Sequence, residues 1–188
     1  MEYHGTLAKP DGSGAEFSVF KGLLTDNEAA QLLSMGSQLL SGEIGSGRGR
    51  ELDLDGRPRF AVEVAELGVI TKHPQEIRPL LENVLLPLLR KFSPTIALSS
   101  AYFRRYVPEE RRYLPPHYEY GSFVVVSIPL QEALAYTGGF FVQGSGKAFL
   151  DRKFLQLSRG DVCVYQYLPA RSGLFMAFLG SAPYSVID

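Results

Sequence analysis

The chain of 188 residues lacks several features that would point to particular classes of protein. It has one cysteine, Cys163, so it can form no internal disulfide; the apolar stretch around this residue favours an inert buried thiol over a nucleophile. A net charge of -1 excludes the strongly basic surface of proteins that bind nucleic acid or anionic membranes. No apolar run reaches the length of a membrane span and the first residues do not resemble a secretory signal, so we expect a cytoplasmic protein.

The composition of the chain predicts one folded domain. Residues 1–16 are rich in glycine, proline and polar side chains, and we expect them to form a flexible N-terminal arm before a single domain over 17–188. The glycine-rich stretch 41–59 predicts a flexible loop within that domain. It lacks the Gly-Lys-Ser/Thr ending of a phosphate-binding loop, so its spaced glycines do not indicate nucleotide binding.

Apolar residues at helical spacing predict a first helix over 28–40. Thr25 or Asp26 is placed to cap this helix, with Glu28 reaching back as in a capping box. A second helix is predicted over 73–92 from its broad apolar face, and Pro87 should kink or split it.

Short segments rich in β-branched and aromatic residues dominate the rest of the chain. Because glycine, proline and aspartate separate them, they predict many short strands, as in a sandwich or barrel. Helices followed by strands indicate an α+β protein in which the helices support one face of a sheet. The predicted strands cover residues 17–24, 95–107, 122–130, 138–144, 147–151, 153–158, 160–168 and 173–180.

A histidine and a carboxylate, His117 and Glu119, stand two residues apart in the stretch "YLPPHYEYGSF". On a strand, residues i and i+2 point to the same face, so this pair could provide two ligands of the 2-His-1-carboxylate site of non-haem iron oxygenases. Taken alone, the same pair also suits a solvated or structural hydrogen bond.

The elements around this pair resemble, in order and spacing, those of the 2-oxoglutarate/Fe(II)-dependent dioxygenases, and most closely the prolyl 4-hydroxylase-like branch. The resemblance covers roughly residues 17–167 and rests on Arg105-Tyr106, Tyr113 with His117 and Glu119, the strand 124–130, Gly138-Gly139, and Gly160-Asp161. It implies a double-stranded β-helix (jelly-roll) core with N-terminal supporting helices. The glycine pairs and turns also have purely structural interpretations.

The resemblance implies an enzyme that hydroxylates a prolyl or similar residue of a peptide or small substrate. His117 and Glu119 would bind Fe(II), 2-oxoglutarate would be the co-substrate, and ascorbate is a further implied cofactor. Tyr106 would contact the far carboxylate of 2-oxoglutarate, although a half-buried core aromatic is an equal interpretation of this residue.

The chain departs from that family in three places. No histidine follows His117, whereas the family has a second histidine ligand some fifty or more residues later. The family's arginine or lysine for the 2-oxoglutarate carboxylate is matched at best by Arg171, brought forward by a deletion, or else the residues after 167 are an atypical or truncated C-terminus. Glu119 stands where the family has aspartate, and one added methylene shifts the ligating oxygens by on the order of an ångström.

Two alternatives to an active dioxygenase follow from these departures. The first is a catalytically inactive double-stranded β-helix that acts as a binding or interaction module. The second and weaker alternative is a hydrolase that pairs Glu109 or Glu110 with Glu119, although "PEERR" suits a solvated charged loop better.

Overall fold

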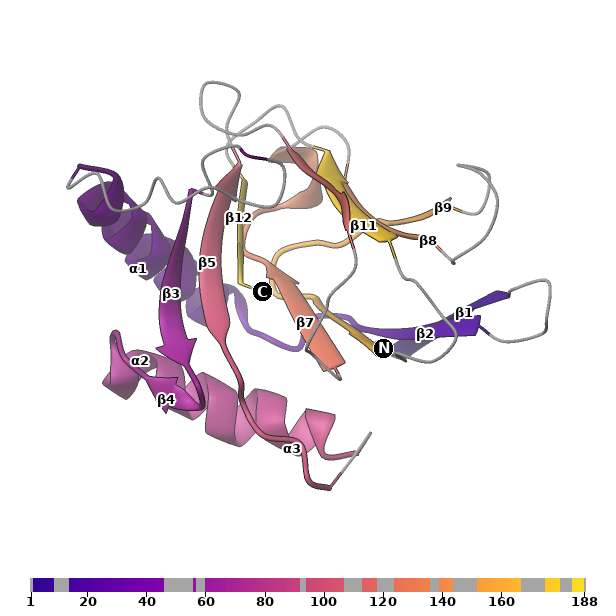
Figure 1. Cartoon of the computed structure of the whole chain (residues 1–188), viewed down its shortest axis with the longest axis horizontal. Helices are drawn as coiled ribbons and strands as arrows, with labels where there is room; N and C mark the ends of the chain where they lie inside the picture. The colour runs from indigo at the N-terminus through magenta and orange to yellow at the C-terminus, as the bar shows by residue number, and fades with distance from the viewer. Residues whose placement is uncertain are drawn as a thin grey trace.

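The protein is described from a computed structural model (Figure 1). The structure describes residues 2–8, 14–45, 56, 60–91, 94–106, 113–117, 124–135, 139–143, 152–166, 175–179 and 184–187. No helix among these residues is long and apolar enough to cross a membrane.

The first helix, α1 (Asp26–Gly45), begins at the capping box that the sequence predicts. The Glu28 carboxylate accepts hydrogen bonds from the Thr25 backbone N–H at 2.8 Å and from its hydroxyl at 2.6 Å, while the Glu28 N–H donates to Thr25 Oγ1 at 3.3 Å. These bonds hold the pKa of the Glu28 carboxyl below its usual range. The helix extends to Gly45, which is further than predicted; residues 46–55 and 57–59 of the expected loop lie outside the described part of the chain.

The second helical region is continuous but irregular, as its prolines predict. It consists of α2 (Pro74–Pro79), a π-helical segment η2 (Leu80–Leu85) and α3 (Leu86–Leu89). At the junction before Pro87 the Leu86 N–H donates to the carbonyl oxygen of Leu81, five residues earlier, so the wider turn lies next to the proline that cannot donate a hydrogen bond.

Twelve strands form two antiparallel sheets among the described residues. The large sheet has the order β1-β2-β10-β7-β12-β5-β3-β4, and the small sheet has the order β6-β11-β8-β9. The strands are β1 (Glu2–Ala8), β2 (Gly14–Phe20), β3 (Ala61–Glu66), β4 (Val69–Ile70), β5 (Ala101–Tyr106), β6 (Tyr113–His117), β7 (Val124–Pro129), β8 (Gly139–Gln143), β9 (Arg152–Leu155), β10 (Val162–Gln166), β11 (Phe175–Leu179) and β12 (Tyr184–Ile187).

The antiparallel sheets and the two helical regions confirm the α+β class that the sequence predicts. The expectation of a loose arm over 1–16 did not anticipate β1, which pairs along its whole length with β2, and β2 begins at Gly14 rather than Phe17. The strands β3, β4, β6 and β12 were also not predicted. The predicted strand at 147–151 lies outside the described residues.

Buried side chains lie on both faces of the large sheet. On one face, strand residues such as Phe103, Ile128 and Val164 pack with apolar residues of α1 and of the α2–α3 region in one cluster. The other face turns toward the small sheet, and there the rings of Tyr165 on β10 and Phe140 on β8 lie 5.9 Å apart. Figure 1 shows α1 and the small sheet on opposite sides of β5, β12 and β7.

Candidate functional site

Tyr106 is the predicted site residue that the structure describes in most detail. It lies on the face of β5 that turns toward the small sheet, which we call the inner face. Phe103 is fully buried against α1, since a Cβ added at Gly36 would lie 2.6 Å from the Phe103 ring. Because side chains alternate along a strand, Tyr102, Arg104 and Tyr106 share the opposite face, which turns toward the small sheet. Tyr106 is 1% exposed there. Tyr106 is therefore a core aromatic, and it is more deeply buried than the half-buried position that the sequence suggested.

Arg104 brings a positive charge to the same face, and the sequence analysis missed it. Its side chain is half-buried, and its guanidinium carbon lies 5.7 Å from the centroid of the Tyr102 ring, within the range of a cation–π interaction. Its cross-strand partner on β12 is Val186. The signal was available, because a strand that directs Tyr106 inward also directs Arg104 inward, whereas Arg105 of the quoted Arg-Tyr pair points to the other face.

The neighbouring strands complete the inner face with aromatic and small residues. Tyr165 on β10 is 1% exposed and pairs with Phe17 of β2, and Ser127 on β7 is fully buried opposite Cys163. Burial raises the pKa of the Cys163 thiol, which confirms the prediction of an inert cysteine.

His117 is the last residue of β6 and stands opposite Met176 of β11 in the strand register. The side chain of His117 lies outside the description, as do Glu119, Arg171 and the Glu109–Glu110 pair as whole residues. The segment β11 reads Phe-Met-Ala-Phe-Leu and has no residue that ligates iron through nitrogen or a carboxylate. Among the described residues, no group of three or more His, Cys, Asp or Glu is placed to hold a metal ion.

The Gly160-Asp161 pair has a structural role, as the alternative interpretation proposed. The buried Asp161 carboxylate accepts hydrogen bonds from Lys21 Nζ at 2.7 Å, the Gly22 N–H at 2.9 Å and the Ser158 N–H at 2.7 Å. Gly160 has φ +79°, and an added Cβ would lie 2.5 Å from the carbonyl oxygen of Leu24. The pair therefore fixes the start of β10 against the turn after β2.

No protein-family model matches the sequence, and no curated protein matches it. The solved structures that are similar to this one include three that each align over 91% of this chain. The prolyl-4-hydroxylase of Pseudomonas putida gives a TM-score of 0.61 at 9% identity over 89% of its chain. A Trichoplax adhaerens prolyl hydroxylase in complex with a hypoxia-inducible factor peptide gives 0.62 at 9% identity over 80% of its chain. HygX from Streptomyces hygroscopicus, with nickel and 2-oxoglutarate bound, gives 0.58 at 17% identity over 80% of its chain.

At identities this low, the similarity bears on the fold and not on the residues of the site. It confirms the resemblance that the motifs around His117 suggested. The chain therefore has the fold of the 2-oxoglutarate/Fe(II) oxygenases, the prolyl 4-hydroxylases among them.

Proposed function

We propose that the chain is a 2-oxoglutarate- and Fe(II)-dependent oxygenase of the prolyl 4-hydroxylase type, with a double-stranded β-helix core and a metal site that has only two protein ligands. The observation that carries the proposal is the distribution of the last eight strands. β5, β7, β10 and β12 are neighbours in the large sheet, in the order β10-β7-β12-β5, while β6, β8, β9 and β11 make up the small sheet. The division of eight strands into two antiparallel sets of four supports the jelly-roll core of this proposal.

The metal ligands in this proposal are His117 and Glu119. His117 is the last residue of β6, and Glu119 follows it at the two-residue spacing that places side chains on one face where a backbone is extended. Iron bound there would supply the oxidising chemistry together with the co-substrate and dioxygen. A site with two protein ligands leaves more positions to water or co-substrate, so it should bind iron more weakly than a complete triad.

Arg104 and Tyr106 are the residues that we assign to the far carboxylate of 2-oxoglutarate. Both lie on the inner face of β5 next to β12, and a guanidinium is the group best suited to bind a carboxylate. Arg171 remains the alternative cation for this role. The likeness to a prolyl hydroxylase that was solved with a peptide supports a peptide substrate over a small molecule.

The test of Arg104 is calorimetric titration of 2-oxoglutarate into the anaerobic Fe(II)-loaded chain. Arg104→Met should weaken binding by roughly 10- to 100-fold, as expected for the loss of charge-assisted hydrogen bonds. Arg105→Met is the matched control, because it removes the neighbouring charge from the opposite face of the strand. Equal affinities of the Arg104→Met and Arg105→Met variants for 2-oxoglutarate would exclude Arg104 as a ligand of its carboxylate. A loss of affinity in Arg171→Met instead would assign carboxylate binding to Arg171.

The test of the metal ligands is Fe(II) titration of the same chain. His117→Ala should weaken iron binding by roughly tenfold or more, since even residues that only support a ligand commonly contribute that much. Glu119→Asp restores the shorter carboxylate of the family and should not abolish binding. Equal iron affinity of the wild type and His117→Ala would exclude His117 as a ligand.

A second candidate function is a module of the same fold that binds without catalysis. The specific observation in its favour is that the residue opposite His117 is Met176, on a strand without an iron-ligating side chain, and that no histidine follows His117. This function predicts 2-oxoglutarate or peptide binding without any Fe(II)-dependent release of succinate.

A further inference from the structure

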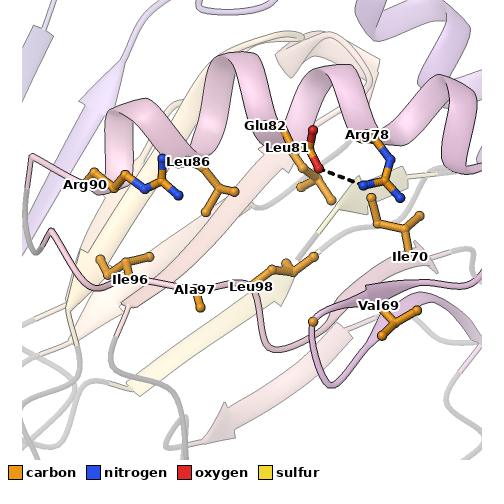
Figure 2. A pocket seen from close by; sticks show the side chains of 11 residues that line it. Val69, Ile70, Arg78, Leu81, Glu82, Leu86, Arg90, Ile96, Ala97 and Leu98 are labelled. Carbon is orange, nitrogen blue, oxygen red and sulfur yellow. Dashed lines mark hydrogen bonds and ion pairs between the residues drawn. The ribbon is translucent and has the colours of Figure 1, made fainter.

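An open groove lies on the helical side of the molecule, away from the face that carries Arg104 and Tyr106. It has a volume of about 380 Å³, and it is bounded by β4, by the irregular helix around η2, and by residues 96–98 (Figure 2). Its apolar lining comes from Val69, Ile70, Leu81, Leu86, Ile96 and Leu98. A volume of this size suits a small molecule or a few residues of a peptide. We call it the β4 groove.

The charges of the β4 groove are unbalanced. Two arginines line it, Arg78 and Arg90, and Figure 2 shows them near opposite ends of the groove. Arg78 Nη1 donates to Glu82 Oε1 at 2.9 Å, which accounts for the one carboxylate in the lining. Arg90 is exposed, and its side chain has no ion pair or hydrogen bond within the described part of the chain. Within the described part of the chain, the groove therefore presents one positive charge without a carboxylate partner beside an apolar floor.

The backbone along one wall of the groove is also unpaired. Ile96, Ala97 and Leu98 belong to no helix or strand, and their N–H and C=O groups make no hydrogen bond with another described residue. The next residue, Ser99, accepts a hydrogen bond from the Gly68 N–H at 3.1 Å, so this wall is tied to the β3–β4 turn. Residues 96–98 are not a sheet edge, but backbone donors and acceptors that lack a described partner can form main-chain hydrogen bonds with an extended peptide.

The rim of the groove extends the apolar surface. The side chain of Val69 is 62% exposed, and that of Leu67 at the tip of the same turn is 86% exposed. Leu67 holds φ +47°, a conformation that is uncommon for a bulky residue. Two exposed aliphatic side chains next to an apolar groove are more typical of a contact surface than of solvated loop residues.

We propose that the β4 groove binds an extended segment of a partner protein in which apolar side chains flank one aspartate or glutamate. The apolar side chains would occupy the floor, the acidic side chain would pair with Arg90, and the main chain would pair with residues 96–98. A helical ligand or a small apolar acid would leave the backbone groups of that wall unused. This inference does not depend on the oxygenase chemistry, because none of its residues belongs to the proposed site.

The experiment uses a defined probe, the fluorescein-labelled and amidated peptide Val-Leu-Glu-Val-Leu, and measures its binding to the full chain by fluorescence anisotropy. The Glu peptide should bind roughly two- to fivefold more tightly than the peptide with Lys in the centre, which is the range expected for an exposed ion pair. R90E should reverse that preference. The control K91E changes an exposed neighbour that does not line the groove, and it should leave the preference intact.

Two further comparisons test the rest of the assignment. Val69→Asp should weaken binding of the Glu peptide. Leu134→Asp, at a position that is 97% exposed and outside the groove, should not change this binding. N-methylation of the peptide backbone should also weaken binding. Both substituted positions are exposed, and circular dichroism of each variant identifies any that does not fold.

The proposal is wrong if the peptide does not bind, if Glu and Lys peptides bind equally, or if R90E and K91E behave alike. Sedimentation velocity tests whether a second copy of this chain occupies the groove instead. If the wild type dimerises and Val69→Asp makes it monomeric, the groove is covered by a second copy of this chain and the proposal is overturned.

Discussion

Gly160→Ala should destabilise the protein well beyond the usual effect of one methyl group. Gly160 has φ +79°, and alanine in this left-handed conformation costs roughly 1–2 kcal/mol. The added Cβ would also lie 2.5 Å from the carbonyl oxygen of Leu24. The segment that contains Leu24 and joins β2 to α1 cannot easily move away, because the Leu24 N–H donates to the carbonyl oxygen of Gly160 at 3.0 Å.

Relief of this contact requires a backbone shift, and overpacking of this kind costs about 1–3 kcal/mol. The free energy of unfolding should therefore fall by about 2–5 kcal/mol in total. For a chain of this length, each kcal/mol lowers the melting temperature by roughly 2–4 °C.

Gly22→Ala is the matched control for this prediction. Gly22 has φ +59° but no atom within 4 Å of an added Cβ, so the substitution should carry only the conformational cost of about 1–2 kcal/mol. Because the chain has no tryptophan, urea unfolding is best followed by circular dichroism at 222 nm. If Gly160→Ala is no less stable than Gly22→Ala, the close approach of Gly160 to Leu24 is not what fixes the start of β10.

Three further outcomes follow from the described contacts. The Thr25 hydrogen bonds lower the pKa of Glu28 in the folded state. The ionised carboxylate therefore contributes its full stability above the unfolded pKa, and this contribution is lost as the pH falls through the folded pKa. The difference in unfolding free energy between the wild type and Glu28→Gln should be constant above about pH 5 and shrink at lower pH. Asp161→Ala leaves the N–H groups of Gly22 and Ser158 without their acceptor and removes the ion pair with Lys21, so it should cost roughly 2–4 kcal/mol in urea unfolding, with Asp26→Ala on the exposed surface as the control. Burial raises the pKa of Cys163, so a thiol-specific aromatic disulfide should react with the unfolded chain and not with the native one at pH 8; rapid native labelling would contradict the buried position.

Local sequence patterns were sufficient to predict much of the secondary structure. The capping box at Thr25 and Glu28, the apolar face of the second helix and the interruption at Pro87 are read from a few neighbouring residues, and each has a direct counterpart in hydrogen bonds or burial. The central strands β7 and β10 could be predicted equally well from the sequence, because they are runs of β-branched and aromatic residues bounded by turns.

The strands that were missed are defined by their pairing with other strands rather than by their own residues. β6 contains Pro115 and Pro116, which argue against a strand, yet it lies at the edge of the small sheet, where an absent N–H donor is tolerated. β12 is short and pairs with β5, some eighty residues earlier in the chain, so nothing local marks it. β1 has the glycine and polar residues of a loose arm and is a strand only through its pairing with β2.

The same limit applies to the candidate site. The alternation along β5 could have identified Arg104 from Tyr106, because this requires only a strand and its period of two. That Val186 stands beside Arg104, and Met176 beside His117, required the pairing of strands that the sequence does not specify.

The most direct test of the proposed function is the Fe(II)-dependent conversion of 2-oxoglutarate to succinate by the purified chain, with a proline-containing peptide present and absent. The account predicts succinate release that requires added Fe(II), is lost in His117→Ala, and falls in Arg104→Met but not in Arg105→Met. Binding of 2-oxoglutarate without any succinate release in the wild type would contradict the oxygenase and favour the module that binds without catalysis.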